Sequence, residues 1–151
     1  MADAEPGLRI TRVFAAPRAD VWREWTEPDR FADWFGGRGV DVPLDSVSMD
    51  VRPGGAWRAT MLIAGAEQRE IHWAGEYREV AEPERLVLTF TDQTSGDAYE
   101  LVTVVLTDLG AGRTQMDFSQ TGGNLTPEEY EGAGQGWGGF FDAMAERLGE
   151  R

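Results

Sequence analysis

The chain has 151 residues, of which 41% are hydrophobic and 27% charged, and this length and composition are typical of one globular domain. The 27 acidic side chains outnumber the 14 basic ones, and the net charge of −13 repels phosphate backbones and anionic lipid, which excludes nucleic acid and membrane surfaces as partners. The lack of cysteine and the single histidine, His72, exclude disulfides, thiolate metal sites and multi-histidine metal sites.

The sequence contains no recognisable targeting or membrane-spanning segment. No run approaches about 20 apolar residues, the length that crosses a bilayer. Residues 1–7 are acidic and lack the apolar centre of a signal peptide. We therefore predict a cytoplasmic protein in which residues 1–7 form a disordered tail and residues 8–151 form a single domain.

The first elements are predicted to be one strand and two short helices. Leu8–Ala15 has the apolar content of a strand, and Pro17 suits the first turn of the helix that follows. Thr26 and Asp29 have the spacing of a capping box, which predicts a second helix over Pro28–Trp34. Glycines at 36, 37 and 39 end that helix.

The middle of the chain is predicted to form an antiparallel sheet. Apolar and polar residues alternate in short segments, and glycine-rich or proline-containing turns separate these segments at hairpin length. The predicted strands cover residues 47–51, 57–63, 69–80, 86–90, 102–106 and 116–120. The predicted turns include Pro53-Gly54-Gly55, Ala64-Gly65-Ala66, Thr94-Ser95-Gly96-Asp97 and Gly110-Ala111-Gly112.

A long C-terminal helix is predicted to begin at Thr126-Pro127-Glu128-Glu129, which combines an N-cap threonine, a proline and a glutamate at the third position. Apolar residues then recur at helical spacing from Tyr130 to Leu148, which predicts a helix of about 22 residues in all. Length and pattern together predict a sheet that curls around this helix.

Five glycines lie in the first half of the predicted helix, at positions 132, 134, 136, 138 and 139. Each mid-helix glycine costs roughly 0.5–1 kcal/mol relative to alanine. Either they let the helix lie close to the sheet, or they leave space for a ligand and let this half flex as a gate. The third alternative is a frayed helix tip.

Several of these segments together resemble the activator-of-heat-shock-protein-90-ATPase-like family of the START-like (SRPBCC) superfamily. Residues 17–28 are similar to its opening helix, and Phe31-Ala32-Asp33-Trp34-Phe35 to the end of its second helix. Residues 49–57 look like its Arg-Pro-Gly-Gly hairpin, residues 75–86 look like its central hairpin, and Gly136-Trp137 matches a pair in its last helix. The resemblance implies an α+β helix-grip fold, with a curved antiparallel sheet of about seven strands on a long C-terminal helix and two short helices after the first strand.

The resemblance also implies an apolar cavity between the sheet and the C-terminal helix. Strand alternation and helical spacing place aromatic and methionine side chains on both faces of that space. The alternative is that these side chains simply fill the core. The predicted lining comprises Trp34, Trp57, Met61, Trp73, Tyr77, Phe90, Met116, Phe118, Gln120, Trp137, Phe141 and Met144.

Polar residues decide whether such a cavity can support catalysis. Gln120 is predicted to point inward as a polar anchor. Glu100 lies two residues before Val102 and would point inward with it if the alternation of the strand is assigned correctly. A shift of one residue would turn Glu100 outward, and we expect it in solvent. His72 alternates opposite to Trp73 and is expected on the outer face. Arg52 and Arg58 are expected to pair with local carboxylates rather than with a ligand.

We favour binding of a lipid or another small hydrophobic or aromatic molecule, without catalysis, metal or cofactor. No nucleophile elbow, P-loop or dinucleotide fingerprint is present. One alternative is a polyketide cyclase- or aromatase-like enzyme, in which Glu100, Gln120 or His72 would be buried and move a proton. Another is a co-chaperone-like regulator of the heat-shock-protein-90 ATPase, with a chaperone contact through an exposed apolar patch. The chain is predicted to be a monomer or a homodimer.

Overall fold

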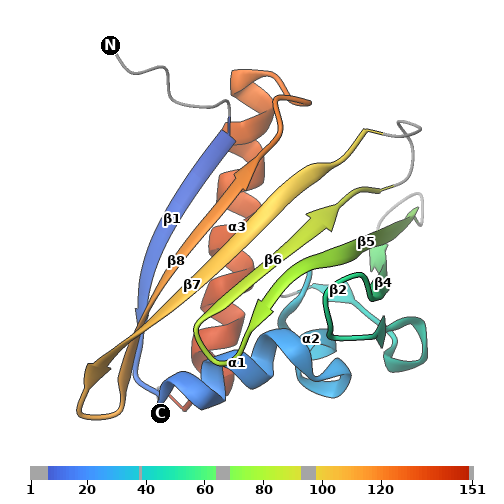
Figure 1. Ribbon diagram of the computed structural model, residues 1–151. Helices are drawn as coiled ribbons and strands as arrows, with labels where there is room; N and C mark the ends of the chain where they lie inside the picture. Colours follow the sequence, from blue (N-terminus) through green and yellow to red (C-terminus); the bar gives the residue numbers. More distant parts are fainter. Residues whose placement is uncertain (1–6, 38, 64–68, 93–97, 150–151) are drawn as a thin grey trace.

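The main feature of the computed structural model, which describes residues 7–37, 39–63, 69–92 and 98–149, is a curved antiparallel sheet against one long helix (Figure 1). The sheet order is β1-β8-β7-β6-β5-β4-β2, and β3 pairs with β4. This arrangement confirms the predicted α+β helix-grip fold. The strands are β1 (Gly7–Phe14), β2 (Val40–Asp41), β3 (Ser48–Met49), β4 (Ala56–Ile63), β5 (Arg69–Ala81), β6 (Arg85–Phe90), β7 (Glu100–Gly110) and β8 (Arg113–Thr121).

Within the described residues the sheet has eight strands rather than about seven, because β2 adds a two-residue strand against Leu62 and Ile63. Two residues are too few to show the alternation that identifies a strand in a sequence. Strand β1 begins at Gly7, which the sequence analysis placed in the tail. The rest of that tail and the predicted turns at 64–66 and 94–97 lie outside the described residues.

The strand predicted over 47–51 is shortened to β3 because the chain already turns at Asp50. The Asp50 N–H donates to the Ala56 carbonyl at 3.0 Å, and a Cβ on Gly55 would lie 1.9 Å from the Asp50 carbonyl oxygen. Only glycine permits this close approach of backbone to backbone. The Pro53-Gly54-Gly55 turn therefore begins earlier than the apolar alternation suggested.

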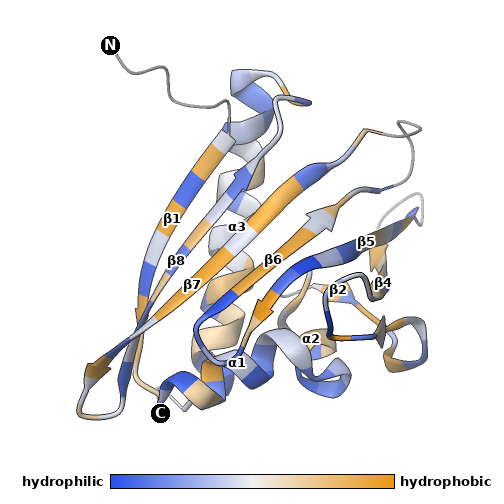
Figure 2. Ribbon diagram, viewed as in Figure 1, coloured by the Kyte–Doolittle hydropathy of each residue, from blue (hydrophilic) through white to orange (hydrophobic). Residues whose placement is uncertain are grey.

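Alternation along the strands places one face of the sheet toward the helix. In β8 the buried residues are Thr114, Met116, Phe118 and Gln120, each followed by a more exposed neighbour. Figure 2 shows the same alternation of hydrophobic and hydrophilic residues along β1. The inward side chains of the strands and the apolar stripe of the C-terminal helix form one core.

Two short helices, α1 (Arg18–Thr26) and α2 (Pro28–Trp34), close one end of the sheet (Figure 1). The predicted Thr26–Asp29 capping box is wrong: Glu27 occupies the N-cap of α2, and no side chain caps it. The Thr26 hydroxyl instead donates to the Trp22 carbonyl at 2.9 Å, which keeps Thr26 in the last turn of α1. A glycine at 37 with φ of 74° follows α2.

The C-terminal helix, α3 (Pro127–Arg147), begins with the predicted capping box. The Glu129 N–H donates to the Thr126 hydroxyl at 3.1 Å, and the Thr126 N–H donates to the Glu129 carboxylate at 2.8 Å. Among the residues that the structure describes, no helix combines the length and apolar character needed to cross a membrane.

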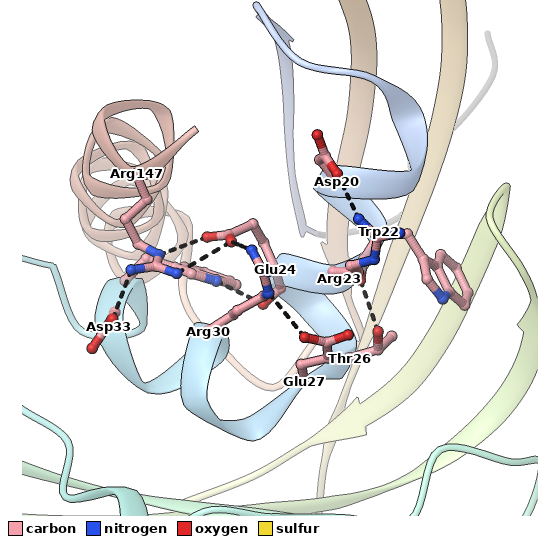
Figure 3. A network of polar contacts seen from close by, with 10 residues as sticks. Asp20, Trp22, Arg23, Glu24, Thr26, Glu27, Arg30, Asp33 and Arg147 are labelled. Atoms are coloured by element: carbon pink, nitrogen blue, oxygen red, sulfur yellow. Dashed lines mark hydrogen bonds and ion pairs between the residues drawn. The ribbon is translucent and has the colours of Figure 1, made fainter. Parts of the chain in front are cut away.

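An ion-pair network around the buried Glu24 attaches the end of α3 to the two short helices (Figure 3). Glu24 of α1 is buried, and the Arg147 Nε donates to its Oε1 at 2.8 Å. Arg147 also contacts Asp33 of α2 at 2.6 Å, and Arg30 lies 3.5 Å from Glu24. Burial of Glu24 is tolerated because two guanidinium groups and their hydrogen bonds accompany the charge.

Candidate ligand-binding site

Aromatic side chains fill most of the space between the sheet and the helices. Trp25 of α1 packs edge-on to Trp34 with ring centroids 4.8 Å apart. Phe118 of β8 lies 5.1 Å from Phe141 and 4.6 Å from Trp137 of α3. Offset and edge-to-face contacts of this kind stabilise a core beyond its buried area.

Eight of the twelve predicted lining residues lie in this filled region and line neither of the two larger cavities described below. Trp57 and Tyr77 border a void of about 10 Å³, which is about the space of one water molecule. The other six pack against neighbouring core side chains. The eight are Trp34, Trp57, Met61, Tyr77, Met116, Phe118, Phe141 and Met144.

A pocket of about 270 Å³ opens between the start of β7, the end of β8 and the first half of α3. It contains four predicted residues, namely Trp73, Phe90, Gln120 and Trp137. Trp73 stacks on Phe90 with centroids 4.4 Å apart and 17° between the ring planes, so these rings form one wall. The remaining lining residues, which the sequence analysis did not assign to the site, are Thr91, Asp92, Ala98, Tyr99, Glu100, Asn124, Leu125, Ala133, Gly136 and Phe140.

Phe140 and Ala133 could have been found from helical spacing. They lie three and four residues from Trp137, on the side of α3 next to the predicted Trp137–Phe141–Met144 stripe. Tyr99 and Asn124 lie in connections outside the strands, where alternation gives no information about side-chain direction.

A chain of hydrogen bonds crosses the inner end of the pocket. The Trp137 Nε1 donates to the Gln120 Oε1 at 2.8 Å, and the Gln120 Nε2 donates to the Glu100 Oε1 at 3.2 Å. The Asn124 backbone and side-chain N–H groups donate to the Glu100 Oε2 at 3.2 and 2.6 Å. Because an indole N–H can only donate, Trp137 fixes the orientation of the Gln120 amide and turns its NH₂ toward Glu100.

Glu100 is 6% exposed, so the expectation that it lies in solvent is wrong. It has the same strand phase as Val102, and its buried carboxylate is supported by donors from β8 and the connection to α3. The backbone also makes room: a Cβ on Gly122, where φ is +150°, would lie 2.4 Å from the Glu100 Oε2. The sequence did not reveal this burial, because the groups that donate hydrogen bonds to Glu100 are distant from it in the sequence.

Tyr130 of α3 closes this cluster on the helix side. Its hydroxyl accepts a hydrogen bond from the Gly123 N–H at 2.7 Å. Burial, followed by the interaction with the Glu100 carboxylate, raises the pKa of Tyr130 above the ordinary tyrosine value. The tyrosine therefore remains a neutral phenol beside the carboxylate.

The prediction for His72 is confirmed. His72 lies exposed on the outer face, where it contacts Thr60 at 3.0 Å and Glu70 at 3.4 Å. Arg52 pairs with Asp50 at 2.9 Å, also as predicted. His72 therefore takes no part in the pocket, and Glu100 and Gln120 are the inward polar residues among the three weighed for catalysis.

The glycines of α3 border open space. A Cβ added at position 132, 134, 136, 138 or 139 would meet nothing within 4 Å, so close packing on the sheet does not explain them. The helix is continuous through all five positions, which contradicts a frayed tip. Gly136 lines the pocket, where the missing side chain leaves volume for a ligand.

A second, more open groove of about 340 Å³ lies on the other side of Phe140. Gly36 and Gly37 face α3 there, and both cavities share Gly136 and Phe140. A Cβ on Gly37 would lie 3.3 Å from the Phe140 ring. The loop after α2 therefore meets the middle of α3 and not its first turns.

Comparison with known proteins agrees with this architecture. A protein from Chromobacterium violaceum, CV1439, is 26% identical, with 94% of this chain and 96% of that chain covered and a TM-score of 0.79. An AHSA1 protein from Silicibacter pomeroyi is 20% identical over 94% and 96% of the two chains, with a TM-score of 0.79. An HSP90 activator from Plasmodium falciparum is 17% identical over 94% and 95%, with a TM-score of 0.72. No curated protein sequence matched.

Similarity below 25% identity demonstrates only a common fold, but the sequence profile of one family matches nearly the whole chain. That family is described as activator of Hsp90 ATPase homolog 1-like protein, and the match covers residues 15–149. The motifs identified in the sequence and the helix-grip fold agree with this match. The chain therefore belongs to the activator of Hsp90 ATPase homolog 1-like family.

Proposed function

We propose that the protein binds a small hydrophobic or aromatic molecule in the pocket between β7, β8 and α3. The observation that carries this proposal is a pocket of about 270 Å³ lined by five aromatic side chains at the edge of an otherwise filled core. A cavity of about 150 Å³ in another protein binds benzene, so this one has room for a two-ring aromatic molecule.

Burial of apolar surface supplies the binding free energy. Each 100 Å² of apolar ligand surface removed from water contributes roughly 2.5 kcal/mol before the entropic costs of association. The wall formed by Trp73 and Phe90 offers a flat ring face, and Trp137 and Phe140 lie on the helix side. A flat aromatic body fits this lining better than a bulky branched one.

The test fills the pocket without weakening the helix. Gly136→Leu places a side chain into the cavity, while Gly132→Leu is the matched control on the same helix, at an exposed position that lines neither cavity. Both replacements remove a mid-helix glycine, so both variants should be at least as stable as the parent. Calorimetric titration with naphthylethanol should show binding to the parent and to Gly132→Leu and none to Gly136→Leu. Equal binding to both variants would refute the proposed site.

A cyclase- or aromatase-like enzyme is the second candidate, and the buried Glu100 favours it. In this role the carboxylate would remove a proton next to a carbonyl group of a bound ligand. β-Tetralone in D₂O tests this chemistry, because Glu100 would take the proton from carbon and solvent deuterium would replace it. Proton exchange followed by NMR should be faster with the parent than with Glu100→Gln, and equal rates would refute the catalytic role.

Regulation of the heat-shock-protein-90 ATPase is the third candidate, supported by family membership and by the name of the Plasmodium falciparum neighbour. Addition of this protein to a purified chaperone of that class should raise its ATPase rate, and Gly136→Leu should leave that effect intact if a surface contact carries it. An unchanged rate would refute this role. The cytoplasmic location and the monomeric or homodimeric state remain predictions.

A further inference from the structure

We infer that the ligand carries a cationic group, such as a protonated amine, which meets the Glu100 carboxylate while an aromatic or aliphatic body fills the rest of the pocket. This inference rests on the proposed binding function and names the chemical class of the ligand.

The charged side chains that line the pocket are acidic. Its described lining contains two acidic residues, Asp92 and Glu100, and no arginine or histidine. Arg78 lies over the ring of the lining residue Tyr99 at 5.3 Å, but it is outside the lining and pairs with Glu76. A ligand carboxylate or phosphate would find no basic partner among the described lining residues, and its burial would cost free energy.

Glu100 itself is buried without a counter-ion among the described residues. Its hydrogen-bonding partners are neutral: the amide groups of Gln120 and Asn124, and the phenol of Tyr130 beside it. Donors of this kind satisfy the oxygens of a carboxylate, which only accepts, but they leave its negative charge uncompensated. A cation from the ligand would supply the missing charge.

The lining next to Glu100 also favours a cation over a neutral polar group. Trp137 hydrogen bonds to Gln120 at this end of the pocket, and its ring lies 5.4 Å from that of Phe90. Aromatic faces attract cations through the negative charge density of the ring, most strongly when water is excluded. A carboxylate beside several aromatic rings therefore matches an amine better than an alcohol.

The experiment compares three probes with one ring system and different head groups: naphthylethylamine, which is cationic at pH 7, naphthylethanol, which is neutral, and naphthylacetate, which is anionic. Calorimetric titration of the parent protein should give the amine an affinity about tenfold or more above the alcohol, and the acid the weakest affinity. The preference should persist in ~0.5 M salt, which screens the attraction of the acidic surface as a whole.

Glu100→Gln should remove the preference for the amine while retaining binding of the alcohol. Glu131→Gln is the matched control, because it removes the same charge from an exposed position of α3 that lines neither cavity. The probe comparison on the parent protein stands even if Glu100→Gln does not fold, as judged by circular dichroism.

The outcomes separate this inference from the function on which it rests. Equal affinity for amine and alcohol in the parent overturns the inference and leaves the binding function intact. A preference that survives in Glu100→Gln, or disappears in Glu131→Gln, also overturns it. Failure of all three probes to bind the parent overturns the proposed site itself.

Discussion

The glycines of α3 make a quantitative prediction about stability. Gly132, Gly134 and Gly138 lie inside the helix, line neither cavity, and would carry a Cβ that meets nothing within 4 Å. Replacing each by alanine reduces the conformational freedom of the unfolded chain without a steric cost in the native state. At roughly 0.5–1 kcal/mol each, the triple variant should gain about 1.5–3 kcal/mol in the free energy of unfolding.

For a chain of this length the gain corresponds to a rise in Tm of about 3–12 °C, measured by circular dichroism in the far ultraviolet. The control is Gly54→Ala, where a Cβ also meets open space but φ is +85°. There alanine should destabilise the protein by about 1–2 kcal/mol, because an L-residue is strained in the left-handed region. An unchanged or lower Tm for the triple variant would refute the claim that these glycines merely border open space.

The same triple variant tests the gate hypothesis. If flexibility of the first half of α3 admits the ligand, alanine should slow association of naphthylethanol while dissociation slows in proportion, so that affinity is preserved. Stopped-flow fluorescence of the lining tryptophans would measure both rates. Unchanged association and dissociation rates would refute the gate hypothesis. The glycines would then act only by leaving volume for the ligand.

Three further changes probe other parts of the structure. Arg147→Met should lower the free energy of unfolding in urea by about 2–4 kcal/mol, because it leaves the buried Glu24 without its closest cation. A loss below about 0.5 kcal/mol, which is typical of a surface ion pair, would contradict this prediction. Thr126→Ala should cost about 1 kcal/mol through the lost helix cap, while an unchanged urea midpoint would show that the cap is dispensable. Burial raises the pKa of Tyr77 and Tyr130 in the native state, so the unfolded chain releases these protons first and stability should fall as the pH rises above about 10. Tyr77→Phe should reduce that loss between pH 8 and 11, and an unchanged slope would contradict the shift.

Much of the fold could be predicted from local chemistry. The capping box at Thr126 and the helical recurrence of Trp137, Phe141 and Met144 are properties of neighbouring residues, and the structure confirms both. The inward or outward direction of side chains along a strand is also a local property, so the buried residues of β4 and β8 lie where alternation placed them. The predicted cap at Thr26 was wrong because an N-cap residue needs an extended backbone, whereas Thr26 is still the last helical residue of α1 and Glu27 is the first extended one.

The sequence by itself determined the fold class, the family and most of the apolar side chains that face inward, because periodicity and turn chemistry act between residues close in the chain. Only the tertiary structure decided which inward side chains fill the core and which border empty space. It also decided that Glu100 is buried, because its hydrogen-bond partners Gln120 and Asn124 lie 20 and 24 residues away in the sequence. Cavities and buried charges depend on contacts between distant segments, and a one-dimensional pattern does not contain those contacts.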